Sequence, residues 1–374
     1  MQLKPFLLDA WLDTYEHDIE FNLAASTGPV WTASELLELG GDQARERYLN
    51  HKVVYGRPAG ADSLREAIAE MQGVPFDSVQ VVTGASEALT VLMWLTAEPG
   101  ANVVVPLPGF ATFSALAESL GLETRFYRVR RENNFCLDVD EIKRLADSKT
   151  KLILVNSPHN PTGATMSDAA MEALHQFTSQ RGIQLVSDEV FHPIYHGRKS
   201  KSAARLPNAT VISDLSKAFS LAGTRTGWMI EHDASRREHY WTARAYFSVC
   251  NNTAGEILSE VAIRNRPTVL RKTQEAATRN LAMLDRFMGD HRDVLGWIRP
   301  QGGMTAFPWL ISAEDARPFC QAAAAHGILF APGDCFDVPS HFRLGFAAAG
   351  EDFSRGLDRL RDFVKSWPAR MVTA

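Results

Sequence analysis

Four loops in this sequence carry residues able to do chemistry, and each follows a short apolar run. They span residues 83–87, 156–163, 187–191 and 213–217. Loops at the carboxyl ends of parallel strands meet at one edge of a sheet, which is where open α/β proteins bind their ligands. The four loops therefore predict one site assembled from distant parts of the chain.

The first loop, Thr83-Gly84-Ala85-Ser86-Glu87, lies between a predicted strand and a predicted helix. Its small residues allow backbone N–H groups to approach an anion, and the N-terminus of a helix favours negative charge. Ser86 is equally typical of a simple N-cap with Glu87 in the first helical turn. Anion binding and helix capping therefore both remain open for this loop.

The second loop, Asn156-Ser157-Pro158-His159-Asn160-Pro161-Thr162-Gly163, has two prolines within eight residues. Such a constrained turn can present an amide side chain outward. An ordinary strand-to-helix turn is the alternative, and a lone His159 is more typical of a structural histidine than of a catalyst.

The third loop places the carboxylates of Asp188 and Glu189 next to each other, directly after an apolar run. Two adjacent carboxylates at the end of a buried strand cost free energy unless one is solvated and the other is paired. This cost indicates that at least one of the two has a partner.

The fourth loop holds Lys217 among small and apolar residues, with Arg225 eight residues later. A partly desolvated lysine is one route to an amine that forms Schiff bases. Because a lone lysine is more often a surface charge, Lys217 gains its significance from the other three loops.

Apolar runs and amphipathic stretches alternate through the middle of the chain, and this alternation positions the loops. We expect strands at 79–83, 102–106, 152–155 and 184–187, and helices at 86–97, 112–120 and 168–180. The pattern predicts βαβ units around a mostly parallel sheet that is buried on both faces. From about residue 267 a long helix and shorter strands follow instead. We therefore expect a large domain over residues 36–274 and a smaller one from residues 1–35 and 275–374.

The composition narrows the class of protein. The chain of 374 residues has a formal net charge of -5, which gives no basic surplus for nucleic acid or an anionic membrane. No apolar run approaches the roughly 20 residues that span a bilayer, and the acidic start is unlike a signal peptide. The four cysteines are far apart and show no metal-ligand spacing, and we expect buried reduced thiols rather than a disulfide. We expect a cytoplasmic enzyme without bound metal.

Together the loops resemble the pyridoxal-phosphate-dependent aminotransferases of class I/II, which have fold type I. The most diagnostic parts are residues 155–163, Asp188-Glu189-Val190-Phe191, and Ser216-Lys217 with Arg225. The resemblance covers essentially the whole chain. It implies an α/β fold in which a large domain with a mostly parallel seven-stranded sheet joins a smaller α+β domain. It also implies pyridoxal 5′-phosphate (PLP) as the cofactor.

The resemblance implies the catalytic roles of two residues. Lys217 matches the lysine that holds the cofactor as an internal aldimine and later moves a proton at the substrate Cα. Asp188 matches the carboxylate that keeps the pyridine nitrogen protonated, and Asn160 matches the amide that hydrogen-bonds the ring oxygen O3′.

The remaining cofactor contacts come from the same resemblance. Ala85, Ser86 and Arg225 match the residues that bind the cofactor phosphate, with Ser216 beside them. Tyr55 matches a phosphate-binding tyrosine that the neighbouring subunit of a homodimer contributes. These positions imply a site shared between two copies of the chain.

Three further residues are expected around the ring and the substrate. Phe110 matches the aromatic residue that stacks on the ring. Arg343, in Phe342-Arg343-Leu344-Gly345, matches the arginine that binds the substrate α-carboxylate, for which a planar guanidinium is suited. Gly28 is also assigned to substrate binding.

Two positions depart from the family pattern. Phe191 stands where the family usually has a tyrosine that donates to O3′, and losing that donor is expected to raise the pKa of the internal aldimine. Asp214 stands where a phosphate-binding serine or threonine is common. An acid beside a dianion is unfavourable, so either Asp214 points away or Ser213 and Ser216 take over its role.

The family resemblance favours transamination between an α-amino acid and a 2-oxo acid. A second, partial resemblance is to the capreomycidine synthases, which eliminate the β-hydroxyl of a hydroxylated arginine and close a guanidine ring. It is carried by residues 8–12, 160–163 and 302–308 and by Phe191. A non-enzymatic alternative is a regulator in which this fold is fused to a DNA-binding module. It is disfavoured because no helix-turn-helix extension or basic arm precedes the enzyme segment.

The side chain of the substrate is less defined. Arg57 is available for an acidic substrate but matches no motif. The acidic residues Glu16, Asp18 and Glu20 are available for a cationic one, although such a run is more typical of a solvated surface.

Overall fold

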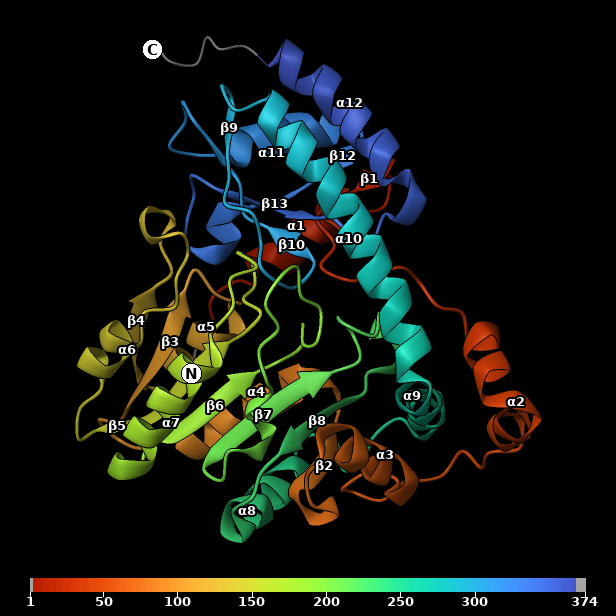
Figure 1. Cartoon of the computed structure of the whole chain (residues 1–374). Helices are drawn as coiled ribbons and strands as arrows, with labels where there is room; N and C mark the ends of the chain where they lie inside the picture. The colour runs from red at the N-terminus through yellow and green to blue at the C-terminus, as the bar shows by residue number, and fades with distance from the viewer. Residues whose placement is uncertain (1–2, 368–374) are drawn as a thin grey trace.

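The structure is a computed structural model that describes residues 3–367. A seven-stranded sheet with flanking helices forms one body, and the C-terminal elements form a smaller body above it in the view of Figure 1. The first residues of the chain belong spatially to the smaller body, because strand β1 pairs with β12.

The central sheet has the strand order β2-β8-β7-β6-β5-β3-β4. Adjacent strands of this sheet are parallel, except that β8 runs antiparallel to both β2 and β7. The predicted mostly parallel, seven-stranded sheet is therefore confirmed. Its strands are β2 (Val79–Val82), β3 (Asn102–Leu107), β4 (Glu123–Arg128), β5 (Thr150–Asn156), β6 (Gln184–Asp188), β7 (Ala209–Asp214) and β8 (Gly227–Ile230).

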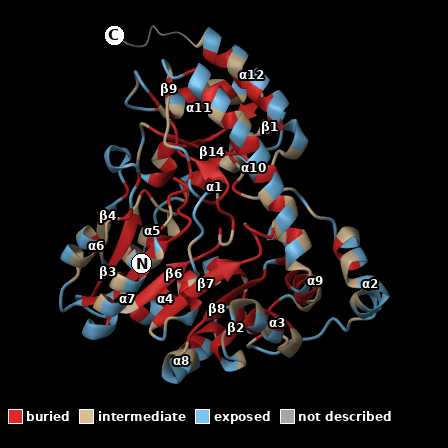
Figure 2. Ribbon diagram, viewed as in Figure 1, coloured by how far each residue is buried: buried red, intermediate tan, exposed pale blue. Residues whose placement is uncertain are grey.

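The central strands are apolar along their length because both faces of the sheet are buried. In β5, Ile153 and Val155 pack into one core while Leu152 and Leu154 pack into the other. Successive side chains of a strand point to opposite faces, so a continuous apolar run is what a two-sided sheet requires. Figure 2 shows these strands as the buried centre of the body.

Helices cover the two faces. Helices α4 and α8 pack on the same core as Leu152 and Leu154, whereas α3, α6 and α7 pack on the opposite one. The helices are α1 (Leu7–Tyr15), α2 (Ala33–Leu49), α3 (Asp62–Gln72), α4 (Gly84–Thr96), α5 (Thr112–Ser119), α6 (Val139–Leu145), α7 (Asp168–Arg181), α8 (Ala234–Ala245), α9 (Thr253–Arg264), α10 (Arg266–Asp290), α11 (Arg317–Ala325) and α12 (Phe353–Ser366).

The smaller body is built around short strands and the N-terminal segment. Strand β14 lies between β10 and β13, and the backbone N–H of Gly345 donates to the carbonyl of Leu23. A side chain at Gly345 would collide with the carbonyl oxygen of Ala25, so only glycine permits this approach. The strands here are β1 (Phe21–Asn22), β9 (Leu295–Gly296), β10 (Thr305–Ala306), β11 (Trp309–Leu310), β12 (Ile328–Leu329), β13 (Ala331–Pro332) and β14 (Phe342–Gly345).

Helix α10 connects the two bodies. It runs for 25 residues and contacts α9 at one side and α12 at the other. Residue 275, where the sequence pattern places a domain boundary, lies inside this continuous helix. The chain therefore passes between the bodies through a helix rather than a flexible linker, as Figure 1 shows.

Several features concern the whole described chain. Within residues 3–367 no helix is long and apolar enough to cross a bilayer. The same residues contain no group of three or more His, Cys, Asp or Glu side chains placed to hold a metal ion. The four cysteines are unpaired; Cys320 and Cys335 are buried as expected, Cys250 is half-buried, and the expectation is wrong for Cys136, which is exposed.

Candidate active site

The candidate site lies at the carboxyl edge of the central sheet. Asn156 ends β5 beside Asp188, which ends β6, and Asp214 ends β7 next to them. The carbonyl of Asp188 accepts hydrogen bonds from the Ser157 N–H at 3.0 Å and from the Asn156 amide at 3.2 Å. The predicted convergence of the loops at one sheet edge is therefore what brings these residues together.

Asp188 is 4% exposed, and its Oδ1 accepts a hydrogen bond from the Val190 N–H at 3.1 Å. Burial raises the pKa of Asp188 to about 7, and the nearby Asp214 carboxylate adds to the effect. A cation bound opposite Asp188 would bring this pKa down again, because an opposite charge favours the ionised carboxylate. The carboxylate is thus suited to face a protonated ring nitrogen.

Lys217 follows β7 and its Nζ donates a hydrogen bond to Ser26 Oγ at 3.0 Å. Burial lowers the pKa of Lys217, and the Arg343 and Arg225 guanidinium groups contribute in the same direction. The carboxylates of Asp214 and Asp188 act in the opposite direction. A lysine with a lowered pKa is a better nucleophile and base near neutral pH.

Arg343 lies on β14 and is 3% exposed. Its Nη1 donates to Asn160 Oδ1 at 3.3 Å, and its Nη2 donates to the Ala24 carbonyl at 2.8 Å. Burial lowers the pKa of Arg343 to about 10. Among the described residues its Nε has no hydrogen-bond partner, although this atom is buried. A buried guanidinium with an unused donor is equipped to bind a carboxylate.

The predicted phosphate contacts gather where β2 meets α4. Gly84 has a positive φ of 73°, and a Cβ on it would lie 2.7 Å from Arg225 Nη2. The Ala85 N–H donates to Asp214 Oδ2 at 3.4 Å, and the Ser216 hydroxyl donates to the same oxygen at 3.0 Å. We call Gly84, Ala85, Ser216 and Arg225 the phosphate site. The left-handed backbone at Gly84 and the Arg225 guanidinium suit an anion, whereas the donors of Ala85 and Ser216 are engaged by Asp214.

The other predicted residues are placed as follows. Phe110 packs edge-to-face on Phe6, with ring centroids 5.6 Å apart, and so borders the N-terminal segment. Ser86 is exposed in the first turn of α4. Tyr55 is 86% exposed. Gly28 abuts Ser220, whereas Ser26, two residues earlier, makes the contact with Lys217.

Phe191 and His159, which lie within the loops that carry Asp188 and Asn160, have different surroundings. Phe191 is 1% exposed, and the Cβ position of Gly303 lies 3.5 Å from its ring. His159 bridges two segments, because its Nδ1 lies 2.8 Å from Thr162 Oγ1 and its Nε2 lies 3.1 Å from the Pro108 carbonyl. Both ring nitrogens of His159 are thereby occupied, which makes it a structural residue of the loop.

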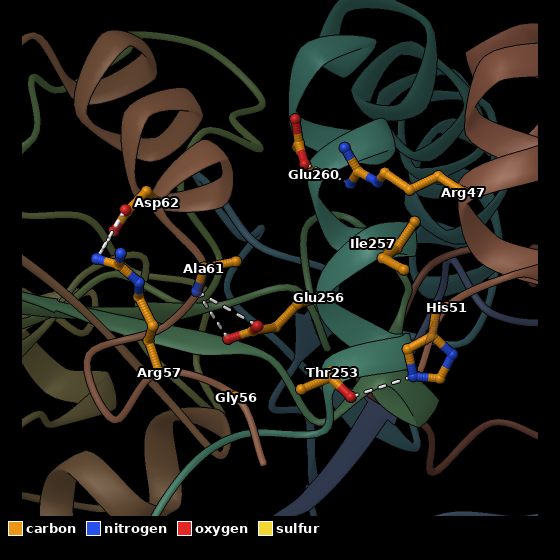
Figure 3. Close-up of a pocket in the computed structure, with 10 residues that line it drawn as sticks. All are labelled: Arg47, His51, Gly56, Arg57, Ala61, Asp62, Thr253, Glu256, Ile257 and Glu260. Atoms are coloured by element: carbon orange, nitrogen blue, oxygen red, sulfur yellow. Dashed lines mark hydrogen bonds and ion pairs between the residues drawn. The ribbon is translucent and has the colours of Figure 1, made fainter. Parts of the chain in front are cut away.

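Two of the charged residues considered for the substrate side chain, Arg57 and Glu20, are engaged in other contacts. Arg57 pairs with Asp62 at 2.8 Å, at the rim of a 320 Å³ pocket between α2, α3 and α9. Figure 3 shows this pocket, with Glu256 accepting from the Ala61 N–H inside it. Glu20 pairs with Arg359 at 3.0 Å on the outer face of α12. These contacts leave Arg57 and Glu20 on the surface.

Ser26 and Ala24 were missed by the sequence reasoning. Both belong to the N-terminal segment, which β14 holds against the site. The signal that was available was Gly345, two residues after Arg343, because a glycine in a strand often marks close approach of another backbone. The sequence did not reveal which segment approaches.

Comparison with known proteins agrees with this geometry. The profile of the family described as aminotransferase class I and II matches residues 44–360. Capreomycidine synthase from Streptomyces vinaceus is 27% identical, over 94% of this chain and 91% of its own length. A PLP-dependent aminotransferase from Streptococcus suis superposes with a TM-score of 0.93 at 26% identity, covering 99% of this chain and 100% of its own. The PLP-dependent cyclase OrfR superposes with a TM-score of 0.88 at 26% identity, covering 98% of this chain and 99% of its own.

The residues present fit the cofactor of these enzymes. Lys217 would supply the amine, Asp188 would pair with the ring nitrogen, and Asn160 would offer an amide to the ring oxygen. At the phosphate site the backbone of Gly84 has a positive φ of 73°, which favours glycine, and the Arg225 guanidinium lies beside it. PLP is therefore the cofactor, and this chain belongs to the aminotransferase class I and II family.

Proposed function

We propose that this protein is a PLP-dependent aminotransferase that transfers the amino group of an α-amino acid to a 2-oxo acid. The observation that carries the proposal is the convergence of Lys217, Asp188 and Arg343 on one site, with burial lowering the pKa of Lys217 and raising that of Asp188. Perturbed pKa values of this kind are typical of catalytic groups.

Lys217 is the general base and acid of the proposed reaction. When bound, PLP supplies an electron sink for the negative charge that develops at the substrate Cα. Because burial lowers its pKa, the Lys217 amine is more readily neutral and able to take the proton from that Cα. Ser26 Oγ, at 3.0 Å, orients the Nζ atom and accepts a hydrogen bond from it.

Arg343 orients the substrate. The Asn160 amide oxygen and the Ala24 carbonyl hold the guanidinium in place, so little side-chain freedom is lost when a carboxylate binds. The buried Nε donor then gains the acceptor that it lacks among residues 3–367. This arrangement favours an α-amino acid over a simple amine.

A homodimer completes the proposed site. Tyr55 is exposed beside Val53 and Val54, which are 90% and 65% exposed. Adjacent apolar side chains on a surface favour burial by another chain. The family role of Tyr55 assigns that chain to a second copy, whose phosphate site receives the tyrosine. Four unpaired thiols suit a reducing compartment, so we place this dimer in the cytoplasm.

A second candidate is a lyase and cyclase reaction, in which a hydroxylated arginine-type amino acid loses its β-hydroxyl and closes a ring. It is supported by the likeness to capreomycidine synthase and to OrfR. Phe191 also supports it, because the hydroxyl that the family usually places there is missing from this site.

The experiment that separates the two reactions uses the holoenzyme without any 2-oxo acid. A panel of amino acids, including arginine and β-hydroxyarginine, is added while absorbance follows the cofactor and mass spectrometry follows the product. A lasting loss of the visible absorbance, together with formation of one equivalent of 2-oxo acid as product, supports transamination. Recovery of the absorbance, with many turnovers to a dehydrated or cyclised product, supports the second candidate and refutes the first.

A further inference from the structure

Asp214 points into the phosphate site. Its Oδ2 accepts hydrogen bonds from the Ala85 N–H at 3.4 Å and from the Ser216 hydroxyl at 3.0 Å. Its Oδ1 accepts from the Ser216 N–H at 2.9 Å. Neither arrangement considered from the sequence is found: Asp214 does not point away, and the Ser213 hydroxyl donates to the Glu189 carbonyl at 3.2 Å instead of taking its place.

The carboxylate of Asp214 thus engages the donors that the family resemblance assigns to the cofactor phosphate. Asp214 is 6% exposed, so water cannot separate it fully from an anion bound at Ala85 and Ser216. A phosphate monoester is mostly a dianion above its second pKa of about 6. Placing this dianion against a buried carboxylate is unfavourable, because like charges at close range disfavour ionisation of both.

The other charged groups around Asp214 do not remove this conflict. Arg225 and Lys217 are the nearby cations, and the Lys217 nitrogen would be held at the cofactor aldehyde rather than at the phosphate. On β6, Asp188 adds negative charge, whereas Glu87 on α4 is neutralised by Arg244 at 3.1 Å. The net charge around the phosphate site is therefore less positive than it would be with serine at position 214.

We propose that Asp214 makes the phosphate site bind its ligand together with one proton, which is shared between the carboxylate and the phosphate. The inference rests on PLP as the cofactor of the proposed function. It follows that the phosphate group adds least to cofactor affinity at alkaline pH, because binding that takes up a proton weakens as pH rises. It also follows that serine at this position strengthens the binding of the phosphorylated cofactor.

The test compares PLP with pyridoxal, which has the same aldehyde and ring but no phosphate. Each is titrated into cofactor-stripped full-length protein at several pH values, and visible absorbance reports occupancy of Lys217. The change in the ratio of the two dissociation constants from one protein to another isolates the effect of the phosphate site, because the lysine and ring contributions, and the internal hemiacetal of free pyridoxal, are common to all the proteins. The variants are Asp214→Ser, Asp214→Asn, and Asp293→Ser as an exposed control.

In the wild-type protein and the Asp293→Ser control, the preference for PLP over pyridoxal is expected to fall about tenfold or more between about pH 6.5 and 8.5. Asp214→Ser and Asp214→Asn are expected to flatten this dependence and to bind PLP about tenfold more tightly at the alkaline end, with pyridoxal unchanged. An unchanged ratio and pH dependence in both variants would overturn the inference while leaving the proposed function intact. A wild-type protein that binds neither compound would overturn both.

Discussion

The Nζ atom of Lys217 donates a hydrogen bond to the hydroxyl of Ser26 at 3.0 Å, although 191 positions separate the two residues. This hydrogen bond joins the loop after β7 of the central sheet to the N-terminal segment. Because Ala24 in the same segment accepts from Arg343, the lysine and the arginine are aligned by a common backbone. The N-terminal segment is consequently in direct contact with two residues of the proposed site.

Removing this hydroxyl tests its role in positioning the lysine. Ser26→Ala is expected to lower kcat about tenfold, because the Nζ atom loses an acceptor that orients it for proton transfer. The isotope effect with Cα-deuterated amino acid is expected to rise as proton transfer becomes slower. Thr27→Ala is the neighbouring control. An unchanged isotope effect would show that Ser26 only packs against the lysine.

Arg343→Lys tests carboxylate binding at constant charge. The ammonium group lacks the planar fork of donors, so kcat/KM is expected to fall about 100-fold, mainly through KM. Cofactor content is expected to stay the same. Arg355→Lys, on the exposed face of α12, serves as the control and should behave as wild type. A normal KM in Arg343→Lys would contradict the role given to this residue.

Phe191→Tyr restores the hydroxyl that the family usually has. A donor beside the ring oxygen stabilises the deprotonated state of the lysine-bound cofactor, so its pKa is expected to fall by about one unit. The visible absorbance titrated against pH measures this value. Phe191→Leu adds no donor and should titrate as wild type; equal values in all three proteins would rule out the explanation.

His341 predicts how stability depends on pH. It is 4% exposed, its ring stacks on Phe307 at 4.8 Å, and burial lowers its pKa to about 4. Since the unfolded state has a histidine pKa of about 6.5, it binds more protons than the folded state between about pH 6.5 and 4. The stability contributed by neutral His341 is complete above this window and is lost as pH falls through it.

The expected loss from His341 is about 2 kcal/mol between pH 7.5 and pH 5. His341→Phe keeps the aromatic packing and removes the titration, so its free energy of unfolding should fall less over the same interval. Denaturant unfolding of both proteins at the two pH values measures the difference. Parallel losses in the two proteins would show that His341 does not titrate as its burial indicates.

The sequence predicted the parts of this site whose information is local. Buried strands are apolar on both faces, and the loops that end them carry Asn156, Asp188 and Lys217, so both the sheet and the convergence of these residues followed from the pattern. The orientation of Asp214 could not follow, because it depends on where the Ala85 N–H and the Ser216 hydroxyl lie in space.

The contact between Ser26 and Lys217 could not be predicted for a similar reason. It arises because β14 holds residues 23–25 against the sheet edge, and nothing in the local sequence specifies that packing. The residues that Tyr55 would contact could not be predicted either, because they belong to a second chain. Contacts that join distant segments were thus the part that required the three-dimensional structure.

The central claim is that Lys217 carries the cofactor. Borohydride reduction of the holoenzyme fixes the cofactor to its lysine, and peptide mass spectrometry then identifies that lysine. We predict one phosphopyridoxyl group per chain, on the peptide that contains Lys217, and none in Lys217→Ala; the exposed Lys199→Ala control should be labelled as wild type. Labelling of a different lysine, or of none, would contradict the account.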